Sequence, residues 1–237
     1  MQAAADCHTG LGEWRQAEML MLGIAERYDA AMSYYFWCRA NGHGNLDKAR
    51  QMARTGLRVA DPYEVGMFQI AEGNAVEALA TLRRDYANRK NLFSGLYAAV
   101  ILDQQGKAAE RDELLQALAQ ARPDAGPNSL GGEERAVALA RRMRDLLRSG
   151  IDATTERAVA EGVMPASLRD NAGSARYVAA KFLSLHGQAS LAKDFYLHCF
   201  KGPDQGIHSR ALAAVELEKL GVAIPTSAAA AQPAGEK

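Results

Sequence analysis

The side chains that most often hold metals are few and poorly placed in this sequence. Five histidines and three cysteines are present, and two pairs, Cys7–His8 and His198–Cys199, are adjacent. Adjacent residues on a helix point about 100° apart, so neither pair can share one ion. No C-x-x-C or H-E-x-x-H spacing occurs, although zinc sites are commonly built on such spacings. We therefore expect no metal and no cofactor.

Nucleophilic or nucleotide-dependent catalysis is not predicted either. Cys38 and Cys199 lie in amphipathic segments, where cysteine usually serves as a small buried hydrophobic residue. No G-x-x-x-x-G-K-[ST] loop occurs, and strand patterns that would present one are nearly absent. We predict a non-catalytic chain. An enzyme whose site is assembled from scattered residues is the alternative, because Cys–His partners meet only in space.

One segment is rich in arginine. The stretch RAVALARRMRDLLR carries Arg135, Arg141, Arg142, Arg144 and Arg148. Nearby acidic residues dilute this charge, and no aromatic residues interleave, as binding of single-stranded nucleic acid would favour. We predict a solvated helix face, with a nucleic-acid contact through 135–148 as the alternative.

Bulk properties narrow the possible partners and the compartment. The chain has 28 basic and 28 acidic residues, so no net charge steers it toward nucleic acid or an acidic membrane. An odd number of distant cysteines fits a reducing compartment. No signal peptide is evident, and no apolar run reaches the roughly 18 residues of a spanning helix. We expect a cytoplasmic protein without a membrane partner. A helix that begins at Met1 without a cap leaves open a regulatory or interaction module of a larger enzyme.

Apolar residues that recur every three or four positions predict helices along the chain. A spacing of glycine and alanine recurs along these helices. A glycine followed five residues later by alanine occurs at Gly12, Gly44, Gly73 and Gly187. A weaker copy at Gly106 carries Arg111 where the alanine is expected. Glycine supplies the left-handed cap of a helix that must reverse direction, and alanine lets the next helix approach closely. Arg111 therefore predicts a looser helix pair around 90–122.

These features resemble the tetratricopeptide repeat family over 1–122 and 174–221. The family places a small residue seven before the turn glycine, and here those positions hold Ala5, Gly66, Ala99 and Ala180, with Trp37 as the exception. The resemblance implies an all-α, right-handed α-solenoid of helix pairs.

This interpretation divides the chain into four parts. Repeats occupy 1–122, and 123–170 is a loop and an irregular helical insertion or degenerate repeat. That insertion has helices at 133–149 and 151–162 and a break at Pro165. A repeat with a capping helix over 207–221 occupies 171–221, and a disordered tail follows at 222–237.

The family also lines a concave groove with residues ten, six and three before the turn glycine. Carried over to this sequence, the groove residues are Tyr34, Cys38, Asn41, Tyr63, Met67, Leu96, Asp103, Tyr177 and Lys181. Three tyrosines at one recurring place suit a surface that binds a protein or peptide. Tyrosine as filler between helices is an equally weighted alternative. The sequence thus predicts a scaffold or adaptor that holds a partner segment, and it does not indicate an oligomeric state.

Overall fold

The computed structural model describes residues 2–28, 30–57, 59–122, 132–150, 172–201 and 206–222. Within these ranges the chain is all-helical, without strands, which confirms the predicted all-α class. Ten helices form five pairs: α1 (Gln2–Gly10) with α2 (Trp14–Tyr28), α3 (Ala31–Asn41) with α4 (Leu46–Gly56), α5 (Pro62–Ala71) with α6 (Ala75–Arg89), α7 (Leu92–Gln104) with α8 (Ala108–Gln120), and α11 (Ala172–Leu185) with α12 (Ala189–Lys201). Helix α9 (Gly132–Ser149) follows α8, and α13 (Ile207–Lys219) follows α12.

The turn glycines act as the sequence predicts. Gly73 has φ of 80°, and the next residue, Asn74, donates its backbone N–H to Gln69 O at 2.8 Å. The same glycine conformation and five-residue hydrogen bond recur after α1, α7 and α11. This is the Schellman arrangement, which satisfies carbonyls that the helix end leaves unpaired. Local chemistry therefore sets four of the five reversals.

Small residues let the paired helices approach each other. The alanines five after the turn glycines are buried: Ala17, Ala49, Ala78 and Ala192. A Cβ added to Gly66 of α5 would lie 2.5 Å from Leu82 Cδ2 of α6. Where Arg111 replaces the alanine, α7 and α8 pack as closely as the other pairs, so the expected looseness is wrong. Arg111 instead pairs with Asp103 of α7 and Asp112 of its own helix, which neutralises its charge at the interface between the two helices.

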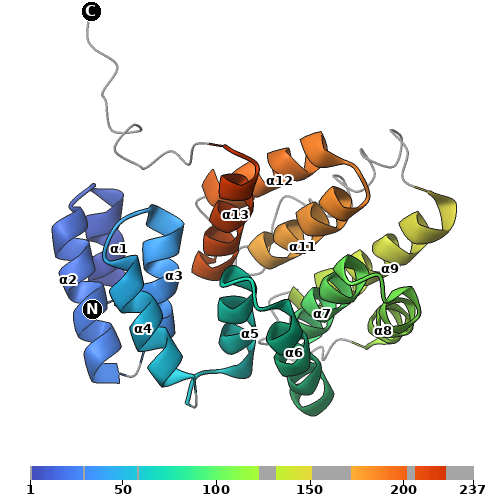
Figure 1. Ribbon diagram of the computed structural model, residues 1–237, viewed down its shortest axis with the longest axis horizontal. Coiled ribbons are helices and arrows are strands. Elements are labelled where there is room, and N and C mark those ends of the chain that lie inside the picture. Colours follow the sequence, from blue (N-terminus) through green and yellow to red (C-terminus); the bar gives the residue numbers. More distant parts are fainter. Residues whose placement is uncertain are drawn as a thin grey trace, which may run out of the picture.

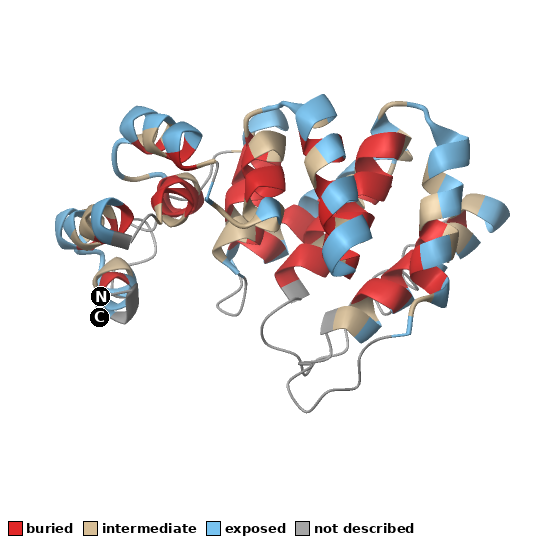
Figure 2. Cartoon of the chain, turned by 90° about the horizontal axis from the view of Figure 1, so that it is seen from below, coloured by how far each residue is buried: buried red, intermediate tan, exposed pale blue. Residues whose placement is uncertain are grey.

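The chain folds back over itself after α9. Figure 1 shows α1–α9 following one another across the molecule, with α11–α13 lying beside the middle of that row. Helix α11 packs against α7 and α9, and α13 packs against α3, α5, α11 and α12. The predicted capping helix therefore covers α12 on one side and the first helices of earlier repeats on the other. Figure 2 shows the buried residues where helices face one another and the exposed residues on the outer surfaces.

A buried carboxylate joins α3, α4 and α5. Glu72, directly after α5, accepts a 2.6 Å hydrogen bond from Tyr35 Oη of α3 and another at 2.6 Å from Arg50 Nε of α4. Its side chain is only 7% exposed, and Arg39 and Arg54 lie within 3.8 Å and 3.6 Å. Helices α4 and α5 hardly touch each other, so this cluster, the packing of α3 on α5 and the packing of α13 on α3 connect the first four helices to the rest.

Some predictions concern residues outside the described ranges. They are the loop that begins at residue 123, the 151–162 helix, the break at Pro165 and all but the first residue of the 222–237 tail. The predicted 133–149 helix is α9. The domain boundaries stay a prediction. Among the helices that the structure describes, none combines the length and the apolar character needed to cross a membrane.

Candidate functional site

The residues predicted to line an open groove are mostly enclosed by the chain itself. Six of the nine are buried: Tyr34, Cys38, Asn41, Met67, Leu96 and Tyr177. The other three, Tyr63, Asp103 and Lys181, are partly exposed. Helices α11 and α13 fill the space that the family resemblance assigns to a partner. The expectation of an open groove is therefore corrected, and binding through these residues stays a prediction.

Tyr34 and Cys38 face away from this filled space. The α3–α4 turn has four residues, 42–45, whereas the other four turns have three. One extra residue rotates α3 by about 100° relative to a register counted back from Gly44. Tyr34 Oη consequently donates a 2.7 Å hydrogen bond to Glu18 Oε1 of α2, and Cys38 lies beneath Gly44. In their place Phe36 reaches α13, with its ring 4.5 Å from the ring of His208.

The other predicted tyrosines belong to an interior column of rings. Tyr63 contacts Tyr97 edge-on at 6.1 Å between ring centroids, and Tyr97 stacks on Tyr177 at 5.6 Å. Tyr177 contacts Tyr196 at 5.8 Å, so the column runs from α5 through α7 and α11 to α12. Burial raises the pKa of all four hydroxyls, which keeps them protonated. The column favours tyrosine as filler between helices over tyrosine as an exposed recognition surface.

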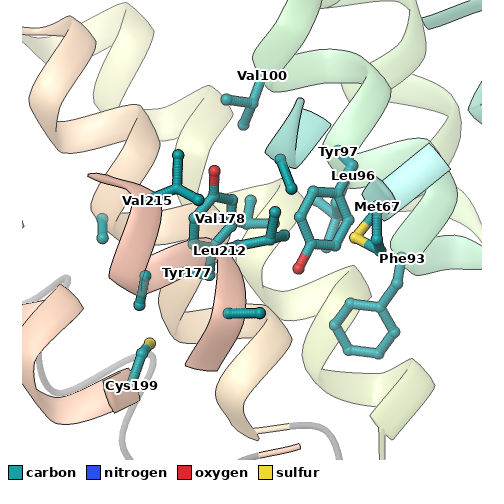
Figure 3. Packing of buried hydrophobic residues seen from close by; sticks show 14 of the residues in the cluster. Met67, Phe93, Leu96, Tyr97, Val100, Tyr177, Val178, Cys199, Leu212 and Val215 are labelled. Atoms are coloured by element: carbon teal, nitrogen blue, oxygen red, sulfur yellow. The ribbon is translucent and has the colours of Figure 1, made fainter. Parts of the chain in front are cut away.

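Met67 and Leu96 belong to the same interior. Both side chains are fully buried, and Figure 3 shows them beside Tyr97. Leu212 and Val215 of α13 enter this cluster from the other side. Helix α13 thus packs on the first helices of the pairs through apolar contacts of the kind that a bound amphipathic helix makes.

Polar contacts fix α13 along the edges of this apolar interface. Lys181 Nζ of α11 lies 2.8 Å from Glu216 Oε2, and Arg39 Nη1 of α3 lies 3.4 Å from Glu218 Oε2. Arg210 Nη2 donates to Asn41 Oδ1 at 3.4 Å. Asn41 and Lys181 are both among the predicted groove residues. Here Lys181 pairs with a carboxylate of the same chain.

Asp103 connects neighbouring repeats through an ion pair and a hydrogen bond. Its carboxylate pairs with Arg111 of α8 and accepts a 2.8 Å hydrogen bond from His186 Nε2, beside α11. Burial acts to raise the pKa of Asp103, but these two partners outweigh it and lower the pKa. The side chain is 7% exposed. Asp103 therefore joins α7, α8 and α11 and has little surface left for a partner.

The two buried cysteines, Cys38 and Cys199, are poor nucleophiles. Burial raises the pKa of the Cys38 and Cys199 thiols to about 12, so both are protonated near neutral pH and weak nucleophiles. In the part of the chain that the structure describes, no group of three or more His, Cys, Asp and Glu side chains is placed to hold a metal.

The arginine helix is only partly solvated. Arg141 Nε donates to the backbone oxygen of Ala119 at 2.9 Å. Arg144 and Arg148 line a cavity of about 280 Å³ between α8 and α9, together with Arg111. Arg135 and Arg142 are half-buried. The predicted solvated face therefore holds for only some of its arginines.

Several residues of this interface were not predicted from the sequence. Tyr97 lies one position from the predicted Leu96 and carries the ring column, and Phe36 takes the place predicted for Tyr34. Ser209 of α13 was missed as well, although its Oγ lies 3.3 Å from Ser174 Oγ, which lies 3.1 Å from Tyr63 Oη. No family signature marks these positions, because they depend on the return of α13 to α5.

No family model, curated protein or solved structure matches the chain.

Proposed function

We propose that this chain is a non-catalytic, protein-binding scaffold built as a right-handed α-solenoid of tetratricopeptide-like pairs. The face formed by the first helices of the pairs, α3, α5 and α11, recognises an amphipathic helix of a partner protein. In this chain α13 occupies that face. The single observation that supports this proposal is the seating of α13 along α3, α5 and α11, with an apolar centre and a charged rim.

The side chains of α13 describe the partner. Four small residues, Ser209, Ala211, Ala213 and Ala214, are at most 1% exposed, so the helix axis approaches the face closely. Leu212 and Leu217 are fully buried, and each contributes about 1.5–3 kcal/mol of hydrophobic free energy. A partner helix would therefore need small residues at its centre, leucine anchors and acidic residues that meet Lys181 and Arg39.

Competition between α13 and a partner sets the apparent affinity. A face that is open in only a small fraction of molecules binds with an affinity reduced by that fraction. The partner helix would bind weakly to the resting chain and more tightly once α13 is loosened. Loosening α13 without altering the face should expose this difference.

A peptide of residues 206–222 provides the test. Its affinity for the wild-type chain would be compared by fluorescence anisotropy with its affinity for a Leu212→Ala/Leu217→Ala chain. We expect the double variant to bind at least tenfold more tightly, because both truncations weaken only the resident helix. A Leu220→Ala chain is the matched control, since Leu220 is 45% exposed, and it should bind as the wild type does.

Two results would refute the proposal. One is equal, weak binding by the wild type and the double variant while circular dichroism shows both to be folded. The other is global unfolding when α13 is loosened, because the face would then not exist without its resident helix.

A weak nucleic-acid contact is a second candidate, favoured by the cavity that Arg111, Arg144 and Arg148 line with Gln116. Arg111 already pairs with Asp103 and Asp112, so two arginines remain for phosphates. Binding of a single-stranded oligonucleotide should then weaken steeply with salt and with Arg144→Gln. Binding unaffected by both changes would exclude this candidate.

A further inference from the structure

One arginine of α11, Arg176, lies near Arg135 of α9 and lines a cavity together with Lys201 of α12. Arg135 lies in α9, Arg176 in α11 and Lys201 at the end of α12. Burial first, and then the positive charge of Arg176, lower the pKa of the Arg135 guanidinium. The two guanidinium groups are therefore near enough to repel each other, and this repulsion lowers the stability of the folded chain.

Among the described residues, every guanidinium nitrogen of Arg135, but only Nε of Arg176, is buried without an acceptor. Nε, Nη1 and Nη2 of Arg135 and Nε of Arg176 are inaccessible to solvent, and none has a hydrogen-bond partner. A buried charge without a partner is strongly destabilising, and buried polar groups in folded proteins are otherwise nearly always paired. Arg135 is such a group, and its neighbour Arg176 carries the same charge, so an anion beside Arg176 would offset the repulsion between them.

A cavity of suitable size opens beside Arg176. Its volume is about 430 Å³, and its described lining consists of Arg176, Asp194, Leu197, His198 and Lys201. Small-molecule sites commonly fall between about 300 and 1,000 Å³. The ring of His198 is held by a 2.9 Å hydrogen bond from Nδ1 to the backbone oxygen of Asp194. The described wall of the cavity thus has two basic side chains, one imidazole, one carboxylate and one apolar side chain.

The charge of the site indicates the kind of anion. In the described wall Arg176 and Lys201 contribute two positive charges and Asp194 one negative charge, and Arg135 adds a further positive charge beside Arg176. A phosphate monoester carries about −1.5 to −2 at neutral pH, whereas a single carboxylate carries −1. Arginine also presents its donors as a planar fork that matches the oxygens of phosphate.

We infer that this cavity binds the phosphate group of a small molecule, with Arg176 as the principal donor, Lys201 at the rim and Arg135 behind. The residues of this site take no part in the contacts with α13 described above. The inference therefore stands apart from the proposed function, and either can fail without the other.

Thermal unfolding of the full chain with inorganic phosphate and with glycerol phosphate tests this site, with sodium chloride at matched ionic strength as reference. We expect both phosphates to raise Tm in a saturable way, as a ligand of the folded state does. Loss of one charged hydrogen bond weakens binding by about tenfold to a hundredfold. Arg176→Gln should raise the Kd of phosphate to that extent and Lys201→Gln by less. Lys193→Gln, an exposed lysine on the same helix, should leave it unchanged.

Arg135→Met separates binding from a structural role. It removes an unpartnered buried charge, so it should raise Tm without phosphate while it weakens the response to phosphate. A Tm lowered equally with and without phosphate would instead mark Arg135 as structural and remove it from the site.

Other outcomes would overturn the inference itself. They are a wild-type response no larger than that to sodium chloride, an unchanged Kd in Arg176→Gln, or an equal response to acetate. Binding of an RNA oligonucleotide without any response to inorganic phosphate or glycerol phosphate would assign these arginines to nucleic acid. A response to glycerol phosphate but not to inorganic phosphate would place the main contacts on the organic part, against the roles given to the arginines.

Discussion

Gly66→Ala in α5 tests whether close approach of paired helices sets the stability of this fold. A Cβ at Gly66 would lie 2.5 Å from Leu82 Cδ2 and 2.6 Å from Leu82 Cγ, and Leu82 of α6 is fully buried. Overpacking of this kind costs about 1–3 kcal/mol, while alanine gains about 1 kcal/mol in helix propensity over glycine. The free energy of unfolding should therefore fall by up to about 2 kcal/mol.

Leu82→Ala makes the expectation sharper through a double-mutant cycle. Alone, Leu82→Ala should cost about 2–5 kcal/mol because it leaves a cavity. In the double variant the new methyl group enters the space that Leu82 vacates. The two costs should then be sub-additive by about 1–3 kcal/mol, within the range of residues in contact.

Guanidinium unfolding followed by circular dichroism measures all four forms. Gly10→Ala is the control, since Gly10 ends α1 and has nothing within 4 Å of an added Cβ. The reasoning fails if Gly66→Ala stabilises the chain as much as Gly10→Ala does. It also fails if the Gly66 and Leu82 effects add to within about 0.5 kcal/mol.

Three further perturbations probe the interface around α13 and the buried thiols. Burial acts to raise the pKa of Glu216, but neighbouring lysines outweigh it and lower the pKa. The ionised group therefore stabilises the fold above its ordinary pKa, and this stabilisation is lost as pH falls through the lowered value. Glu216→Gln should reduce the fall of the unfolding free energy with decreasing pH. An unchanged pH dependence would contradict the pairing of Glu216 with the lysines. Cys38 and Cys199 should resist iodoacetamide in the native chain, because burial raises their pKa to about 12; mass spectrometry showing rapid labelling of either would refute this. Tyr63→Phe should lower the unfolding free energy by about 1 kcal/mol through loss of the bond to Ser174, and no change would make that bond energetically neutral.

The local features of the helix pairs could be predicted because they depend on neighbouring residues. Gly73 and Gly187 adopt positive φ where a helix must end, and a glycine after an apolar-periodic segment is a direct sign of such a cap. Ala78 and Ala192 are buried five residues later, since the next helix begins within one turn. The register of α3 was predicted wrongly, because the extra residue between Asn41 and Leu46 is a change in loop length that a spacing counted from Gly44 hides.

The sequence by itself determined the all-helical class and the positions of the turns between paired helices. It also showed that the common zinc-binding spacings and the nucleotide-binding glycine-rich loop do not occur. Only the tertiary structure decided that Tyr177 is buried with Tyr63 packed beside the same core, and that Lys181 pairs with Glu216 of α13. These contacts join residues 35 to 111 positions apart, and they exist because the chain returns after α9 and lays α13 on α3 and α5. Helix caps are set by the few residues around them, whereas the occupant of a groove is set by competition among all apolar faces that can reach it.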